Sequence, residues 1–183
     1  VSLGILFNDL KKHDSAMHYF EKGQEYFKRV HADNCIIKNR LNISNTLSIL
    51  GKVEESIEIL LELQENPVAI NDDGYMVIVM ICYLNLVDDI DKSYYEKAHR
   101  LALKVDNAQL ITKTLMGMGH YFVSQNQNDS ALLYYKEAES LINPYTNNYD
   151  RFNIPRNLSK IYHNLGHNDS AYYYLEKYLT VSE

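Results

Sequence analysis

The sequence predicts an all-α fold, an α–α superhelix (solenoid) made of about five helical hairpins. The phrase Asp-Ser-Ala occurs at 14–16, 129–131 and 169–171, and the last two copies are 40 residues apart. Apolar residues recur with the period of a helix along nearly the whole chain, and no segment alternates as a strand would. A fixed period of this size is typical of similar supersecondary units that stack on one another.

The expected elements are ten helices in five antiparallel pairs, and each pair forms one repeat unit. The helices are expected at 2–11 and 14–29, 33–50 and 53–65, 69–87 and 91–105, 107–125 and 129–142, and 150–165 and 169–182. The units are then approximately 1–31, 32–67, 68–106, 107–146 and 147–183, which together form a single repeat array. Because the chain starts at Val1 and stops at Glu183 inside an expected helix, we expect a fragment of a longer chain.

The Asp-Ser-Ala motif is suited to the start of the second helix of a unit for a physical reason. An aspartate there is expected to cap the helix, since its carboxylate can accept hydrogen bonds from the unpaired amides of the first turn, for about 1 kcal/mol. The alanine lets the paired helix approach closely. The expected caps are Asp14, Asp129 and Asp169, and the prolines Pro67, Pro144 and Pro155 are expected between units or at a helix start.

Composition limits the classes of function. Lys and Arg total 18 against 24 acidic residues, giving a formal net charge of −6, so direct nucleic-acid binding by this chain is not expected. No run of 18 or more apolar residues exists, and no membrane span is expected. The two cysteines, Cys35 and Cys82, stand in apolar helical surroundings, and both are expected to be buried thiols without a disulfide.

Catalytic and metal sites are not expected either. His163 and His167 have the spacing that places two imidazoles on one helix face, but Gly166 separates them and no further ligand lies nearby. The sequence contains no Gly-x-Ser-x-Gly motif and no glycine-rich phosphate loop. We therefore expect no enzyme activity, no metal ion and no cofactor.

The repeat unit resembles the tetratricopeptide repeat (TPR), which has a large apolar residue beside a small one, an aromatic, then a small residue, an aromatic and another small residue. The resemblance covers about the whole chain and is weakest in the third unit, where Asp91 stands at the small position. The best matches are Met118-Gly119, Phe122, Ala131, Tyr135 and Ala138 in the fourth unit, and Leu3-Gly4, Phe7, Ala16, Phe20 and Gly23 in the first.

In TPR proteins the first helices line a concave groove that binds a peptide or protein segment. The resemblance therefore implies a partner-binding set on those helices, in which asparagines could hold a peptide backbone and Lys or Arg could pair with a carboxylate. The expected set is Lys38, Asn42, Asn45, Met76, Met80, Tyr83, His120, Arg156, Asn157, Lys160 and His163.

Three functions remain open at this point. The first is a non-catalytic scaffold that binds a protein or peptide segment, and the Asp-Ser-Ala form resembles the sensor regions of bacterial signalling and transcription regulators. The second is an allosteric sensor of a small ligand, since stacked units can change curvature. The third is a self-associating architectural module, with a homodimer formed through the C-terminal helix 169–182.

Overall fold

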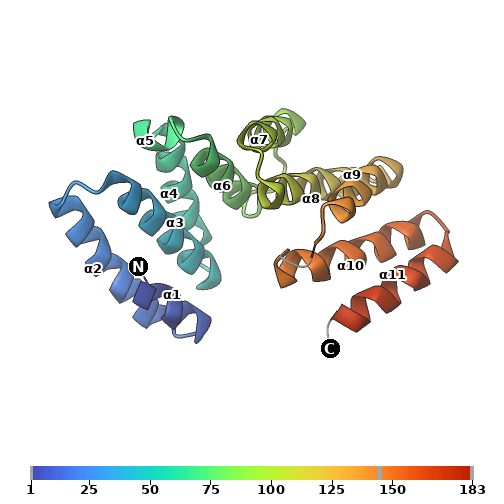
Figure 1. Ribbon diagram of the computed structural model, residues 1–183, viewed down its shortest axis with the longest axis horizontal. Helices are drawn as coiled ribbons and strands as arrows, with labels where there is room; N and C mark the ends of the chain where they lie inside the picture. The colour runs from blue at the N-terminus through green and yellow to red at the C-terminus, as the bar shows by residue number, and fades with distance from the viewer. Residues whose placement is uncertain (1, 144–145, 182–183) are drawn as a thin grey trace. The chain divides into compact units, whose positions relative to one another are not determined.

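The computed structural model describes residues 2–143 and 146–181, which form eleven helices and no strand. The chain divides into two compact units, residues 1–89 and 90–183 (Figure 1). Unit 1 contains α1 (Ser2–Asp9), α2 (His13–Arg29), α3 (Asp33–Ile49), α4 (Val53–Glu65), α5 (Pro67–Ile70) and α6 (Asp73–Leu84). Unit 2 contains α7 (Lys92–Val105), α8 (Ala108–Ser124), α9 (Asn128–Ser140), α10 (Asn148–Asn164) and α11 (Asn168–Val181).

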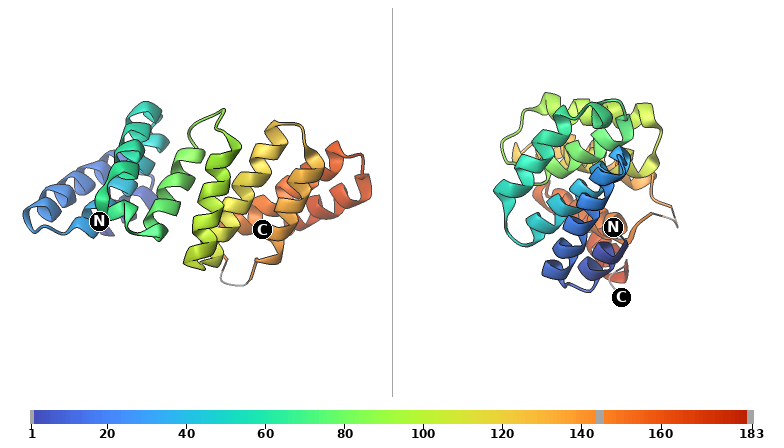
Figure 2. Two further views of the ribbon diagram at one scale, coloured as in Figure 1. Left: turned by 90° about the horizontal axis from the view of Figure 1, so that it is seen from above. Right: turned by 90° about the vertical axis from the view of Figure 1, so that its left-hand side faces the viewer.

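Within each unit, helices that follow one another in the sequence pack side by side (Figure 2). In unit 2 the order in space is the order in the chain, from α7 through α8, α9 and α10 to α11. This nearest-neighbour packing is the arrangement expected of stacked repeats.

The expected all-α class is confirmed, and nearly all helix ends lie within two residues of their predicted positions. The exception is the helix expected at 69–87, which is interrupted and ends early. The side chain of Asn66 accepts hydrogen bonds from the amides of Val68 and Ala69 at 3.0 and 3.3 Å and so starts the short α5. Asp72 then caps α6 by accepting from the amide of Tyr75 at 3.1 Å. Two local caps therefore replace one continuous helix.

Four helical hairpins are closed by the same turn: α1–α2, α3–α4, α8–α9 and α10–α11. In each, one residue of the turn adopts a left-handed conformation, as Gly166 does with φ +77° and Asn126 with φ 56°. The amide of the next residue donates to a carbonyl five residues earlier, for example His167 to Tyr162 at 2.9 Å. This is the Schellman arrangement that ends a helix. The equivalent left-handed residues are Lys11 and Gly51.

This shared turn explains why the expected caps are wrong at Asp14 and Asp129. The second helices begin one residue before these aspartates, after Lys12 and Gln127, and neither position has a side-chain cap hydrogen bond. Asp169 is likewise the second residue of α11. The three carboxylates lie in the first turn, where their charge interacts favourably with the helix dipole.

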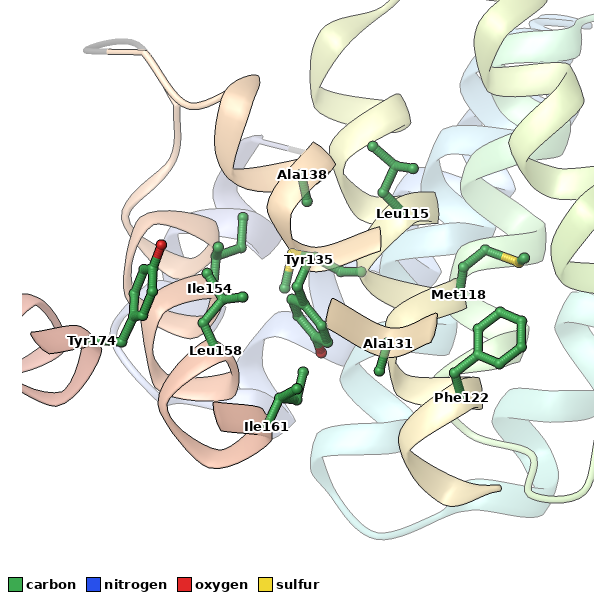
Figure 3. Packing of buried hydrophobic residues seen from close by; sticks show 11 residues of the cluster. Leu115, Met118, Phe122, Ala131, Tyr135, Ala138, Ile154, Leu158, Ile161 and Tyr174 are labelled. Carbon is green, nitrogen blue, oxygen red and sulfur yellow. The ribbon is translucent and has the colours of Figure 1, made fainter. Parts of the chain in front are cut away.

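The closed hairpins pack in two ways. In one, a glycine of the first helix receives an aromatic ring from the second: a Cβ on Gly119 would lie 2.5 Å from Cε2 of Tyr135, and a Cβ on Gly4 would overlap the ring of Phe20. Tyr135 is completely buried and points into the core of unit 2 among Ile161, Leu158 and Ala131 (Figure 3). Glycine is required at these two positions because no side chain fits beneath the ring.

In the other two hairpins a serine replaces the glycine and a leucine replaces the ring. Ser159 donates to the carbonyl of Ala171 at 2.8 Å, and the residue at the ring position is Leu175. Ser44 and Ser56 are hydrogen-bonded through their hydroxyls at 2.8 Å, and Leu60 is at the ring position. A glycine on the first helix is thus paired with a large aromatic ring on the second, and a serine is paired with the smaller leucine.

Two further expectations need correction. Pro155 lies in the interior of α10 and is buried, not at a helix start, so the carbonyl four residues earlier loses its helical donor. Cys35 is exposed on the first turn of α3, whereas Cys82 is half-buried, and neither forms a disulfide. Pro67 does begin α5 as predicted. Pro144 lies outside the described residues.

Two tyrosines of unit 2 should respond in opposite ways to loss of their hydroxyl. The Tyr135 hydroxyl is buried and has no hydrogen-bond partner among the described residues, and burial raises the pKa of this phenol above its usual value. The Tyr174 hydroxyl donates to Glu139 at 2.9 Å. We expect Tyr135→Phe to raise the free energy of unfolding by about 1 kcal/mol and Tyr174→Phe to lower it by about as much. Urea titration of both variants checks this, and a destabilised Tyr135→Phe would contradict it.

Candidate interaction surface

The first helices of the two hairpins in unit 2, α8 and α10, carry a row of basic and imidazole side chains. Arg156, Lys160 and His163 are spaced by four and three residues on α10, which places them on one face, and all three are exposed. His120 on α8 occupies the position equivalent to Lys160, 40 residues earlier, and is also exposed. The helices α8 and α10 are in contact, and the positive charge of Lys160 contributes to lowering the pKa of His120. We call these four residues the basic row.

No carboxylate neutralises the basic row within the part of the chain that the structure describes. The sequence of α8 contains no Asp or Glu, and α10 contains only Asp150, which is completely buried. Arg156 and Lys160 form no ion pair within 4.0 Å among the described residues. Their charges are therefore available to a partner, although the chain as a whole carries −6.

Asp150 has a structural role at the start of α10. Its amide donates to Oδ1 of Asn147 at 2.9 Å, and its Oδ2 accepts from Nδ2 of the same asparagine at 2.5 Å. This reciprocal pair caps the helix. Lys113 of α8 lies 3.6 Å from Oδ1 of Asp150 and 5.5 Å from the centre of the Tyr149 ring. Lys113 was not predicted, although the lack of acidic residues in 108–124 could have singled it out.

His120 differs from the other members of the row because one edge of its ring packs against Tyr135, with ring centres 5.7 Å apart. Partial desolvation, and then the positive charge of Lys160, lower the pKa of His120. His120 is therefore neutral at pH 7 and can both donate and accept a hydrogen bond. The permanent charges of the row are those of Arg156 and Lys160.

The other predicted residue on α10, Asn157, is half-buried, and its Nδ2 donates to the carbonyl of Asn153 at 2.8 Å. One N–H and the carbonyl oxygen of its amide remain for a partner, but the side chain is held against its own helix. This asparagine is therefore a poorer candidate than its charged neighbours for holding a peptide backbone.

Unit 1 holds the remaining predicted residues. Lys38 is exposed, its ammonium lies 5.7 Å from the centre of the Tyr75 ring, and a hydrogen bond with the Tyr75 hydroxyl raises the pKa of Lys38. Asn45 is exposed, whereas Asn42, Met76 and Tyr83 are half-buried. Met80 is 1% exposed, so its placement on a binding surface is corrected: it belongs to the packed interior.

Three pockets lie at turns of unit 2, and most of their lining residues are polar. The first has a volume of about 330 Å³ and contains Asn107, Gln109, Thr112 and Asn147 among its lining residues. Ala108 and Leu141 also line it, but it has no aromatic lining residue, and aromatic residues are common in small-molecule sites. The described residues also hold no group of three or more His, Cys, Asp or Glu that could bind a metal ion.

Comparison with known proteins decides the family. Residues 9–177 match the family described as the SusR N-terminal TPR domain. The chain belongs to this family. The TPR resemblance of the repeat units is thereby confirmed. TPR domains generally serve as scaffolds that bind protein partners, and membership of this family indicates a protein-interaction scaffold. A search of curated proteins gives no significant match.

Solved structures share the fold of this TPR domain. BtubC (BKLC) from P. vanneervenii is similar with a TM-score of 0.77 and 13% identity, over 98% of this chain and 77% of that one. TTC0263, a thermophilic TPR protein of Thermus thermophilus, has a TM-score of 0.64 and 20% identity, over 98% and 88% of the two chains. MamA has a TM-score of 0.59 and 17% identity, over 100% and 95%. In the described part of the TPR domain, no helix is both long and apolar enough to cross a membrane.

Proposed function

We propose that this TPR domain binds an acidic segment of a partner protein through the basic row, and that it serves as the sensor or interaction region of a larger bacterial signalling or transcription regulator. One observation carries the binding proposal. Arg156 and Lys160 are exposed on a helix whose only carboxylate is buried, in a chain that is otherwise acidic. Among the described side chains, no carboxylate forms an ion pair with either residue within 4.0 Å.

The chemistry of the row suits carboxylates. The Arg156 guanidinium can bind a carboxylate through two parallel hydrogen bonds, and the Lys160 ammonium adds a second charge one helical turn away. His120, neutral at pH 7, can hydrogen-bond the backbone of the same segment. Because the net charge of −6 repels acidic partners at long range, binding should depend on close contact with the row.

A charge reversal of Arg156 and Lys160 should weaken binding strongly. The probe is an immobilised array of extended peptides rich in Asp and Glu, paired with the same peptides carrying Asn and Gln. We expect the parent chain to retain the acidic peptides selectively, and Arg156→Glu/Lys160→Glu to lose at least ~10-fold in affinity, since each close charge pair contributes about 1 kcal/mol or more. Raising the salt concentration should weaken the parent's binding in the same direction.

The matched control is Lys22→Glu/Arg29→Glu, which makes the same change in net charge on exposed residues of α2 in unit 1. This variant should bind the acidic peptides within about twofold of the parent if the row, not the net charge, is responsible. Equal loss in both variants, or retention in both, would reject the basic row as the binding site.

The regulatory role is a separate part of the proposal. It is supported by the family description, which names an N-terminal domain, and by the resemblance of the Asp-Ser-Ala repeats to sensor regions of bacterial regulators. The test is to introduce Arg156→Glu/Lys160→Glu into the chromosomal gene and to compare transcript levels with those of the control variant. A defined set of altered transcripts supports a regulator, whereas unchanged transcripts under all growth conditions tested argue for a scaffold with another role.

A further inference from the structure

The helix α4 in unit 1 carries an excess of negative charge that its surroundings only partly neutralise. Its 13 residues include five glutamates and no lysine or arginine. Lys52 pairs with Glu55 at 3.1 Å, and Arg40 pairs with Glu62. Three carboxylates of α4 form no ion pair within 4.0 Å among the described residues, and they are those of Glu54, Glu58 and Glu65. This helix therefore presents unpaired negative charge, as α10 presents unpaired positive charge.

Two of these carboxylates share an exposed stripe of α4 with a leucine. Glu54, Glu58 and Leu61 are spaced by four and three residues, which places them on one face of the helix. All three are exposed, and Leu61 is 47% exposed. The helix itself packs against both α3 and α6, so the stripe stays exposed after its neighbours in the chain have packed. We call these three residues the acidic stripe.

We propose that the acidic stripe of one copy of the chain docks on the basic row of a second copy. The two surfaces are opposite in charge and equal in spacing, since Arg156, Lys160 and His163 are also separated by four and three residues. An α-helix rises 1.5 Å per residue, so each set extends over about 10 Å along its helix. The inference rests on the proposed function, because it uses the same basic row and names a second copy of the chain as one of its occupants.

A parallel alignment of the two helices brings each carboxylate of the stripe opposite a permanent positive charge. Glu54 then faces Arg156, and Glu58 faces Lys160. The guanidinium of Arg156 can hold a carboxylate through two parallel hydrogen bonds, and the ammonium of Lys160 binds the other as a point charge. The third members of the two sets, a leucine and a histidine, then meet beside the charge pairs.

Other alignments of the same helices match less well. The antiparallel alignment sets Arg156 against Leu61 and so loses its bidentate partner. A parallel alignment shifted by one turn would use Glu62, which Arg40 already binds. The proposed alignment is the one in which both permanent charges of the row meet a carboxylate that is unpaired among the described residues.

Docking of a second copy has a consequence for the proposed function. Charge pairs at an exposed surface are individually weak and are screened by salt, so the contact is reversible. A second copy therefore competes with an acidic partner segment for the basic row. The apparent affinity for that segment should fall as the concentration of the chain rises.

The test reverses the charge of each surface separately. Glu54→Lys/Glu58→Lys reverses the stripe and Arg156→Glu/Lys160→Glu reverses the row, and all four positions are exposed. By sedimentation velocity at low salt and ~10 to ~200 µM, where a weak specific interface is populated, the parent should show a sedimentation coefficient that rises with concentration. Each variant alone should lose at least ~10-fold in its association constant, because like charges then face each other.

An equimolar mixture of the two variants is the decisive measurement. The reversed stripe of the first variant fits the reversed row of the second, and the two unchanged surfaces fit as in the parent. The mixture should therefore regain most of the association that each variant loses. Net charge does not explain such a result, since the reversals shift the charge of −6 by four in either direction and both variants remain negative.

The matched control is Glu21→Lys/Glu25→Lys, which makes the same change with the same spacing on exposed residues of α2, and it should associate like the parent. Circular dichroism should show all variants folded, and Glu54→Gln/Glu58→Gln, which should also weaken association, replaces the lysine variant if that one is not. A monomeric parent at the highest concentration, association that survives either reversal, or a mixture that stays monomeric would each overturn the proposal.

Peptide binding separates this contact from the proposed function. Glu54→Lys/Glu58→Lys retains the basic row, so it should bind the acidic peptides as tightly as the control variant of equal net charge. If the peptides bind and the chains do not associate, docking of a second copy is wrong and the proposed function stands. If the chains associate as described and no acidic peptide binds, the docking stands and the proposed function is wrong.

Discussion

Gly119→Ser is expected to lower the free energy of unfolding of unit 2 by about 2 kcal/mol, even though serine is the natural residue at the equivalent positions 44 and 159. The added Cβ would lie 2.5 Å from Cε2 of Tyr135, and this ring is completely buried, so the ring or the helix must shift within a packed core. Tyr135→Leu alone is expected to cost about 2 to 3 kcal/mol because it leaves a cavity among Leu158 and Ile161.

The double variant Gly119→Ser/Tyr135→Leu reproduces the serine and leucine of the other two hairpins, and it should lose at least ~1 kcal/mol less than the sum of its parts. Serine at 119 could then donate to the carbonyl of Ala131, as Ser159 does to Ala171 at 2.8 Å. Urea unfolding of the four proteins measures the coupling. Additive losses would show that the two hairpin types are not alternative solutions to the same packing problem.

Gly23→Ala is the matched glycine substitution for this series. A Cβ at Gly23 would lie 3.4 Å from Oδ1 of Asn39, an ordinary contact, so helix propensity should dominate and raise the free energy of unfolding by up to about 1 kcal/mol. If Gly23→Ala were as destabilising as Gly119→Ser, a general effect of removing helical glycines would explain both results and the ring contact would not.

Glu139→Gln is expected to lower the free energy of unfolding by about 1 to 2 kcal/mol, because Glu139 joins α9 to α11. Its carboxylate accepts from Lys177 at 2.5 Å, from Lys136 at 2.7 Å and from the Tyr174 hydroxyl at 2.9 Å. The Glu139 side chain is only 15% exposed, but the two lysines are 41% and 45% exposed, and water weakens their share of the interaction.

The interactions of Glu139 also predict that the free energy of unfolding depends on pH. Partial burial alone would raise the pKa of Glu139, but the hydrogen bonds from Lys136, Lys177 and Tyr174 outweigh it and hold the pKa below its ordinary value of 4.5. The stabilisation is therefore complete above pH 4.5 and is lost as the pH falls through the lowered pKa. The difference in free energy of unfolding between parent and Glu139→Gln should shrink over that interval. Glu137→Gln, at an exposed position on the same helix, should show no such convergence.

The features that could be predicted from sequence are those set by local period and residue size. The 40-residue spacings of Ala16 to Ser56 and of Ala131 to Ala171 placed four of the five hairpins, because a small residue is needed wherever two helices cross closely. The aspartate caps could not be predicted correctly, since the left-handed turn residue, for example Lys11, starts the next helix one residue earlier. The break at 71–72 depends on side-chain caps that compete with a strongly helical pattern.

The sequence also allowed part of the candidate surface to be predicted. The period of α10 was sufficient to place Arg156, Lys160 and His163 on one exposed face. It was not sufficient to show that Met80 is buried, because its cover comes from tertiary packing and not from its own helix. The pairing of Lys113 with Asp150 joins residues 37 positions apart, and no local pattern reveals such a contact.

The pairing of glycine with an aromatic ring, or of serine with leucine, has a consequence for how such repeats diversify. A repeat copied with glycine and tyrosine cannot acquire serine first without forcing a side chain into the ring, whereas shortening the ring first leaves a void that a later serine can partly fill. Either order therefore passes through a less stable intermediate, because Gly119→Ser alone is expected to cost about 2 kcal/mol and Tyr135→Leu alone about 2 to 3 kcal/mol. Neighbouring repeats that have drifted apart at many surface positions can retain one of two pairings here, because intermediates between them are selected against.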